Sequence, residues 1–117
     1  MSKFEDLKVW QLAHELTLDI YKLIDCYPKE ERYRLSDQLC RAASSIPMNI
    51  CEGSGRRTKK DFCHFLYIAR GSLQELHYQL ILSKDLGLLD QVYYDLLIAK
   101  CNMVGKLLNS LIKTLEV

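Results

Sequence analysis

Apolar residues recur every three or four positions along almost the whole chain, and this spacing is the strongest constraint on its fold. The cleanest example contains Phe62, Leu66, Ala69, Leu73, Leu76, Leu80 and Ser83. Residues 10–27, 35–53 and 93–111 show the same spacing. This period places apolar side chains on one face of an α-helix, whereas no stretch longer than three residues alternates as a half-buried strand does. We therefore expect four amphipathic helices.

Residues that start or stop helices separate these four stretches. Pro28 follows the first stretch, and the Gly-Ser-Gly run at residues 53–55 follows the second. Thr58, with an acidic residue three positions later, opens the third; Gly87 closes it, and Asp90 is a plausible N-cap of the fourth. Because the connections are short, consecutive helices should pack antiparallel. The sequence predicts an all-α fold, an up-down-up-down antiparallel four-helix bundle in one domain over residues 1–117.

The composition excludes several classes of protein. The longest apolar run has five residues, 65–69, which is too short to cross a bilayer, and the N-terminus lacks the apolar region of a secretory signal. The chain has five cysteines, an odd number, and none is spaced as C-x2-C. This argues against both a zinc site and a disulfide framework. We expect a cytoplasmic protein with reduced thiols and no membrane partner.

No arrangement of residues predicts catalysis. His14, His64 and His77 share no helix face, and none has a serine or cysteine at a diagnostic spacing. Asp61-x-x-His64 matches half of a di-iron motif, but the motif does not recur. A Gly-rich phosphate loop and the G-x-S-x-G and H-E-x-x-H motifs are absent from the sequence. We expect no enzymatic activity, no metal and no cofactor.

Two features indicate more contact than one bundle provides. The last helical stretch is apolar at 17 of the 28 positions 88–115, where a stripe of three in seven would give about 12. A glycine lies in the middle of the third helix, where it costs about 1 kcal/mol relative to alanine. It belongs to a strip beside the core face that contains Tyr67, Gly71, Gln74 and Tyr78. A missing side chain between tyrosines suits the close approach of another helix, from the same chain or from a second subunit. We predict a homo-oligomer with this strip at its interface.

Polar residues interrupt the apolar face of the second helix. Ser45, Asn49 and Glu52 are spaced by four and three, so they share one edge of that helix. The third helix has a similar set, which contains Ser72, Glu75 and Gln79. Because a buried polar group without a partner costs a few kcal/mol, we interpret these six residues as an interhelical network that fixes register. A ligand or partner site is the alternative interpretation.

Excess positive charge is confined to one short stretch. The chain has a net charge of +1, yet residues 56–70 contain five basic and one acidic side chain. Four of these cations surround the connection between the second and third helices: Arg56, Arg57, Lys59 and Lys60. Positive charge is unfavourable at the start of a helix, and a bound phosphate would offset it. The cluster is therefore either a solvated charged surface or a site for RNA or DNA phosphates.

Several motifs resemble those of a known family. They are Ser45-Ile-Pro-x-Asn-Ile-x-Glu-Gly53-x-Gly-Arg56, Phe62-x-x-Phe-Leu-x-Ile-Ala-x-Gly-Ser-Leu-x-Glu-Leu76 and Leu86-Gly-Leu-Leu89. N-terminal residues such as Phe4, Leu7 and Trp10 match as well. Over nearly its whole length, the chain resembles the bacterial proteins encoded within intervening sequences of 23S rRNA genes. Related proteins include the accessory variability determinant of diversity-generating retroelements.

The resemblance implies a four-helix bundle that assembles as a homopentamer and has no established catalytic activity. The related accessory determinant is a basic pentamer that binds nucleic acid and works with a reverse transcriptase, whereas the present chain is nearly neutral. Two hypotheses follow. The protein is an oligomer that binds RNA or DNA through the four cations, or it is a structural adaptor that binds another protein, such as a reverse-transcriptase-like partner.

Overall fold

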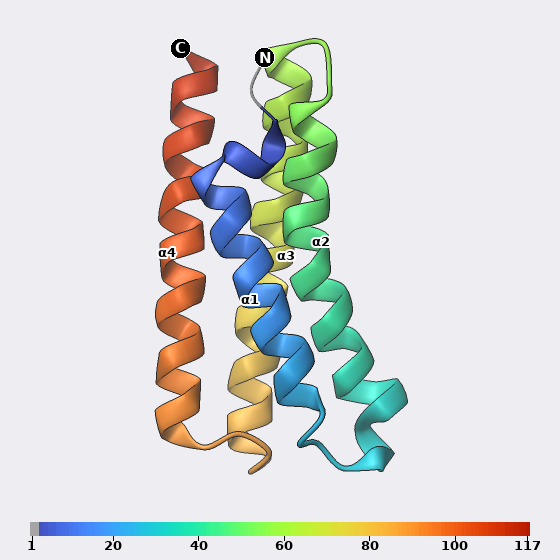
Figure 1. Ribbon diagram of the computed structural model, residues 1–117. Coiled ribbons are helices and arrows are strands. Elements are labelled where there is room, and N and C mark those ends of the chain that lie inside the picture. Colours follow the sequence, from blue (N-terminus) through green and yellow to red (C-terminus); the bar gives the residue numbers. More distant parts are fainter. Residues whose placement is uncertain (1–2) are drawn as a thin grey trace.

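The computed structural model of the protein describes residues 3–117 and contains four long α-helices. They are α1 (Lys8–Ile24), α2 (Asp37–Ser54), α3 (Lys59–Asp85) and α4 (Gln91–Glu116). Figure 1 shows that consecutive helices run in opposite directions, and the described residues form no strand. The predicted up-down-up-down four-helix bundle is confirmed.

The connection between α1 and α2 is more structured than the periodicity indicated. Helix α1 ends at Ile24, and residues up to Tyr27 form a turn, although the apolar period continued to that residue. Tyr27 is nevertheless buried, so a turn residue contributes to the core here. Two short helical segments then lead into α2: η2 (Lys29–Glu31) and the π-helical η3 (Arg32–Ser36). Another, η1 (Phe4–Asp6), precedes α1.

The predicted helix-starting and helix-ending residues of α3 and α4 are confirmed. The Thr58 hydroxyl accepts a hydrogen bond from the backbone N–H of Asp61 at 3.1 Å. The Asp90 carboxylate accepts one from the N–H of Tyr93 at 2.8 Å. Gly87 follows α3 with φ of +79°, a left-handed conformation that glycine adopts without strain. The side-chain caps at Thr58 and Asp90 and the left-handed backbone of Gly87 therefore define three of the four ends of these helices.

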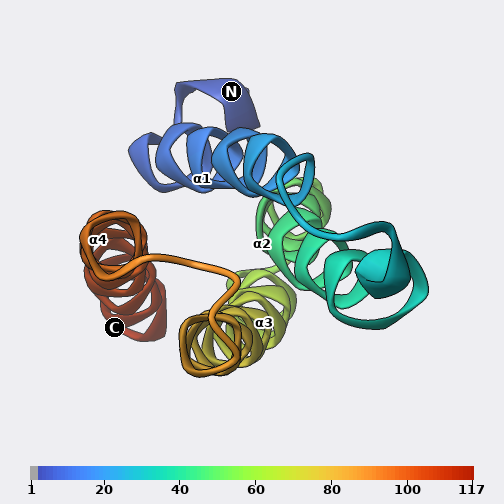
Figure 2. The same ribbon diagram turned by 90° about the horizontal axis from the view of Figure 1, so that it is seen from below.

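The four apolar faces meet along the axis of an elongated molecule, 44 × 24 × 20 Å in extent. Seen along the bundle in Figure 2, each helix lies beside the next one in sequence. Among neighbouring helices, contact is most extensive between α2 and α3 and least extensive between α1 and α4. The largest fully buried side chains come from all four helices and include Leu16, Ile20, Leu39, Ile46, Leu66, Leu80, Leu97 and Leu108. None of the helices in residues 3–117 is long and apolar enough to cross a bilayer.

A proline lies inside α2 without ending the helix. Pro47 has no N–H, so it cannot donate to the carbonyl of Ala43 one turn earlier. The hydroxyl of Thr17 in α1 lies 3.0 Å from this carbonyl oxygen and donates to it. Thr17 is buried, and so is Ala43. A side chain of the neighbouring helix thus satisfies an acceptor that α2 itself leaves unpaired.

Helices α2 and α3 approach each other closely beside their connecting loop, at Gly53. A Cβ atom at this position would lie 2.8 Å from the Cβ of Phe65 and 3.2 Å from the backbone oxygen of Phe62. Real Cβ atoms do not approach other carbons so closely. The absence of a side chain at Gly53 therefore allows the close spacing of the two helices at the end of the bundle where they are connected.

Candidate nucleic-acid interface

The four predicted cations surround the short connection between α2 and α3, and we call residues 56–60 the basic loop. It lies at the same end of the bundle as the C-terminal end of α4 (Figure 1). Arg56, Arg57, Lys59 and Lys60 are all exposed. The structure thus brings the four side chains together on one tip of the molecule.

The four cations differ in their surroundings. Arg56 lies 3.7 Å from the carboxylate of Glu52, and its guanidinium lies 4.7 Å from the centre of the Phe65 ring. Within residues 3–117, no ion pair involves Arg57, Lys59 or Lys60. Lys59 and Lys60 occupy the first turn of α3, where backbone N–H groups lack helical partners. Three of the four cations are therefore available to an anion, while Arg56 is held against the protein.

The predicted polar network joins α2 and α3 through a small set of residues. The hydroxyls of Ser45 and Ser72 lie 2.8 Å apart and share a hydrogen bond. The Asn49 amide donates to the Ser45 hydroxyl at 3.0 Å and to the Ser45 backbone oxygen at 2.7 Å. Ser72 is buried and the other two are half-buried. These three residues form the interhelical link.

The other three residues of the predicted network lie outside this link. Glu52 is exposed and pairs with Arg56, because its position one turn from the loop brings it to that cation rather than to α3. Glu75 is exposed. Gln79 is buried, and its side-chain oxygen has no hydrogen-bond partner within the described residues. Glu75, Gln79 and Ser45 line a shared hollow of about 260 Å³ between α2 and α3.

The strip of Tyr67, Gly71, Gln74 and Tyr78 follows the solvent-exposed surface of α3, and Gln74 also lines the groove between α3 and α4. All four residues are exposed. A Cβ atom added at Gly71 would meet nothing within 4 Å, so no helix of the described chain approaches it. Tyr67 is engaged locally, since its hydroxyl donates to Glu116 at 2.9 Å. The sequence left open a contact of this glycine within the chain or with a second subunit, and residues 3–117 provide no such contact.

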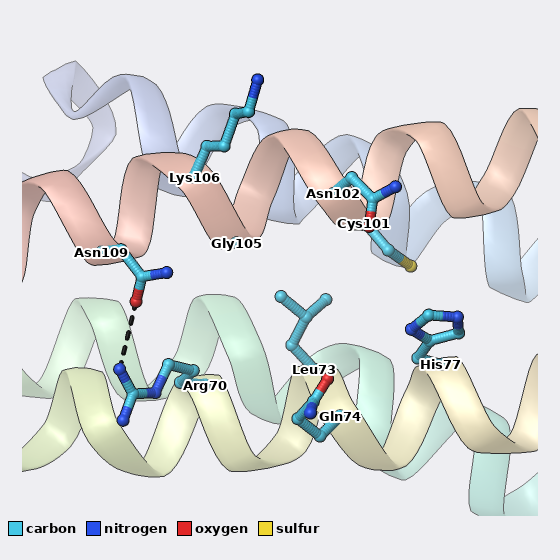
Figure 3. A pocket seen from close by; sticks show the side chains of 9 residues that line it. All are labelled: Arg70, Leu73, Gln74, His77, Cys101, Asn102, Gly105, Lys106 and Asn109. Carbon is cyan, nitrogen blue, oxygen red and sulfur yellow. Dashed lines mark hydrogen bonds between the residues drawn. The ribbon is translucent and has the colours of Figure 1, made fainter.

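A polar groove runs between α3 and α4 and encloses about 760 Å³ (Figure 3). Its polar lining groups are two cations, a histidine and three carboxamides, and none is a carboxylate. They are Arg70, Lys106, His77, Gln74, Asn102 and Asn109. Its remaining lining residues are Leu73, Cys101 and Gly105. Burial raises the pKa of the Cys101 thiol to about 12, so this group stays protonated at neutral pH.

Comparison with known proteins agrees with the fold and with the motifs of α2 and α3. The family model described as the 23S rRNA-intervening sequence protein matches residues 5–110. The chain belongs to this family. A crystal structure of a protein of unknown function from the S23 ribosomal protein family of Bacteroides thetaiotaomicron is 27% identical to it. The match covers 90% of this chain and 98% of the other, with a TM-score of 0.81. Among curated proteins, none matches the sequence.

The groove between α3 and α4 of this family member has no signature in the sequence alone. Its lining residues do follow a helical period, with Arg70, Gln74 and His77 on α3 and Asn102, Lys106 and Asn109 on α4. Each set alone resembles an ordinary solvated helix face. Only the antiparallel register of the two helices makes the two sets face each other.

Proposed function

We propose that this 23S rRNA-intervening sequence protein is a non-enzymatic homo-oligomer that binds RNA or DNA phosphates through its basic loop. The observation that carries the proposal is the position of Arg57, Lys59 and Lys60. They are exposed, lack ion-pair partners in the described chain and lie at the N-terminal end of a 27-residue helix.

This arrangement favours a bound polyanion for a physical reason. The start of a helix carries partial positive charge, so two lysines in the first turn of α3 are electrostatically unfavourable, and Asp61 in the same turn supplies only one negative charge against the four cations of the loop. A phosphate group accepts hydrogen bonds from the side chains and from free backbone N–H groups at that end. Such contacts recognise the backbone and carry little base specificity. We therefore expect binding with weak sequence preference.

Assembly of several copies would place several basic loops on one particle and so increase the number of phosphate contacts. The open space over Gly71 supports a second subunit as its contact, because no other part of the described chain fills it. Exposed apolar side chains on α1 and α4 supply further contact surface: Leu18, Tyr21, Val92, Leu96 and Met103. The resemblance to pentameric relatives makes a homopentamer the assembly that we propose.

Salt dependence tests the role of the basic loop. Each phosphate contact releases counterions, so the log–log slope of affinity against salt reports the number of contacts. Arg57→Gln with Lys60→Gln should reduce this slope by about two units per engaged subunit on duplex probes. The matched control is Lys29→Gln with Arg32→Gln, which removes the same charges at the opposite end of the bundle (Figure 1). Binding that survives the loop variant, or that ignores salt between about 50 and 200 mM, would exclude the loop as the phosphate site.

An adaptor function is the second candidate, and a specific surface favours it. Between α1 and α4 lies a hollow of about 220 Å³ lined by Leu12, Glu15, Leu96, Ala99, Lys100 and Met103. A mostly apolar surface of this kind suits a protein partner. If the wild-type protein binds neither RNA nor DNA at low salt, the nucleic-acid proposal is wrong and the adaptor function replaces it.

A further inference from the structure

The groove between α3 and α4 contains charges of only one sign. Arg70 and His77 extend from α3 toward α4, and Asn109 extends back from α4 (Figure 3). The Arg70 guanidinium donates to the Asn109 side-chain oxygen at 3.1 Å and lies 4.6 Å from the centre of the Tyr67 ring. These two contacts hold the cation at the groove with donors still unused. The site is therefore built for an anion.

A second hollow continues the groove toward the end of the molecule that carries the basic loop. It encloses about 310 Å³, shares Arg70 and Asn109 with the groove, and adds Lys113. Its one carboxylate, Glu116, accepts the hydrogen bond from the Tyr67 hydroxyl. At 1.5 Å per residue, Arg70 lies about 16 Å along α3 from Lys59, and because eleven residues make about three turns, both side chains leave the same face of the helix. The cations of the loop and of the groove thus follow one path along the helix.

The other lining groups suit nucleotides better than a simple anion. Carboxamides such as Asn102 and Asn109 can both donate and accept, as recognition of base edges requires. Leu73 offers an apolar surface, and a Cβ atom at Gly105 would lie 3.4 Å from its side chain, so the missing side chain deepens the groove at this point. A phosphate at Arg70, bases toward the carboxamides and a second phosphate at Lys106, whose amine points to the outer side of α4 in Figure 3, would use every class of lining group.

The width of the groove selects one strand. Packed helices lie about 8–10 Å apart, so the furrow between them is too narrow for a duplex. Single-stranded nucleic acid exposes its phosphates and its base edges at once and can enter such a furrow. We propose that the α3–α4 groove binds single-stranded nucleic acid that continues from the basic loop. This inference rests on the proposed function of that loop.

Two labelled probes test the inference by fluorescence anisotropy: an oligouridylate of about 12 nucleotides and a blunt RNA duplex of the same length. Arg70→Gln with Lys106→Gln should weaken oligouridylate binding about tenfold and lower its salt slope by about 1.4, while duplex affinity stays within about twofold. Gly105→Met fills the groove without changing charge, and it should also weaken binding of the single strand alone. Circular dichroism verifies that each variant is folded.

The outcomes separate the groove from the loop. The loop variant, Arg57→Gln with Lys60→Gln, should weaken the binding of both probes. The Lys29→Gln/Arg32→Gln control should weaken the binding of neither. If the loop variant weakens the binding of both probes while the groove variants leave oligouridylate binding unchanged, the loop binds nucleic acid and the groove proposal is wrong. Equal loss for both probes in the groove variants would also overturn it, because the effect would then reflect total charge. If the wild-type protein binds neither probe at low salt, both proposals fail.

Discussion

The hydroxyl of Thr17 donates to the backbone carbonyl of Ala43, which joins α1 to α2 at the one carbonyl that Pro47 leaves without its helical donor. The same hydroxyl lies 2.9 Å from the carbonyl of Ala13 in its own helix, so a single donor serves two buried acceptors. A threonine on an apolar helix face is thereby explained by a proline in the neighbouring helix.

Thr17→Val keeps the side-chain volume and removes this donor. We expect a loss of about 1–3 kcal/mol in the free energy of unfolding, because the Ala43 carbonyl becomes buried and unpaired. Urea denaturation measures the loss. Thr114→Val is the matched control, since Thr114 bonds only the carbonyl of Ser110 and is exposed. In a Pro47→Ala background the loss should shrink, because residue 47 then supplies the missing N–H; an unchanged loss would contradict the explanation.

The Ser45–Ser72 hydrogen bond should make these two residues energetically coupled. Ser72→Ala leaves the Ser45 hydroxyl with one partner fewer, and we expect it to cost about 1 kcal/mol of unfolding free energy. The double variant with Ser45→Ala should cost less than the sum of the single changes. Ser44→Ala is the control, because that hydroxyl contacts only its own helix. Strict additivity of Ser45→Ala and Ser72→Ala would show that the bond contributes nothing to stability.

Two glycines in helices should respond to alanine in opposite directions. Gly53→Ala forces a Cβ atom against Phe65 and Phe62, so we expect it to destabilise the bundle by about 1–3 kcal/mol. Gly71→Ala meets open space, and its better helix propensity should stabilise the protomer by up to about 1 kcal/mol. Thermal unfolding of both variants compares these effects directly.

Light scattering extends the glycine comparison to assembly. If a second subunit packs on Gly71, a bulky Gly71→Leu should weaken the oligomer while helicity is kept. A wild-type mass of 13.6 kDa at micromolar concentration would show a monomer and refute the proposed assembly.

The buried thiol of Cys101 should make stability fall at alkaline pH. Burial raises its pKa from 9.0 to about 12, so between these values the folded protein holds a proton that the unfolded chain has released. Stability is therefore full below about pH 9 and falls above it, by at most about 1.4 kcal/mol per pH unit for one proton. Cys101→Val should flatten the dependence of unfolding free energy on pH between 9 and 10. An equally steep dependence in this variant would assign the effect to other groups.

The fold was accessible from the sequence because its signals are local. Periodicity gave the four helices, and side-chain caps such as Thr58 and Asp90 marked where two of them begin. The end of α1 was less accessible: Tyr27 is buried from a turn, so its apolar character looked like one more helical position. An apolar spacing of three and four shows which residues are buried, but it does not by itself fix the backbone conformation of the last one.

The candidate sites depend on contacts between helices, and these were only partly predictable. Spacing alone placed Glu52 and Asn49 on one edge of α2, but it could not show that Glu52 lies close enough to Arg56 to pair with it. It also could not show that Gln79 is buried without a partner for its side-chain oxygen in the described chain. Register and helix rotation decide such partners, and a single sequence does not encode them in any short-range pattern.

The close approach at Gly53 has a consequence for the loop beside it. The N–H groups of Gly55 and Arg56 bond back to the carbonyls of Glu52 and Gly53, and Thr58 caps α3, so nearly every residue of the connection is anchored. A loop fixed in this way has little conformational entropy left to lose when a ligand orders it. The backbone of the basic tip is thus pre-organised, and a ligand has to order only the cationic side chains.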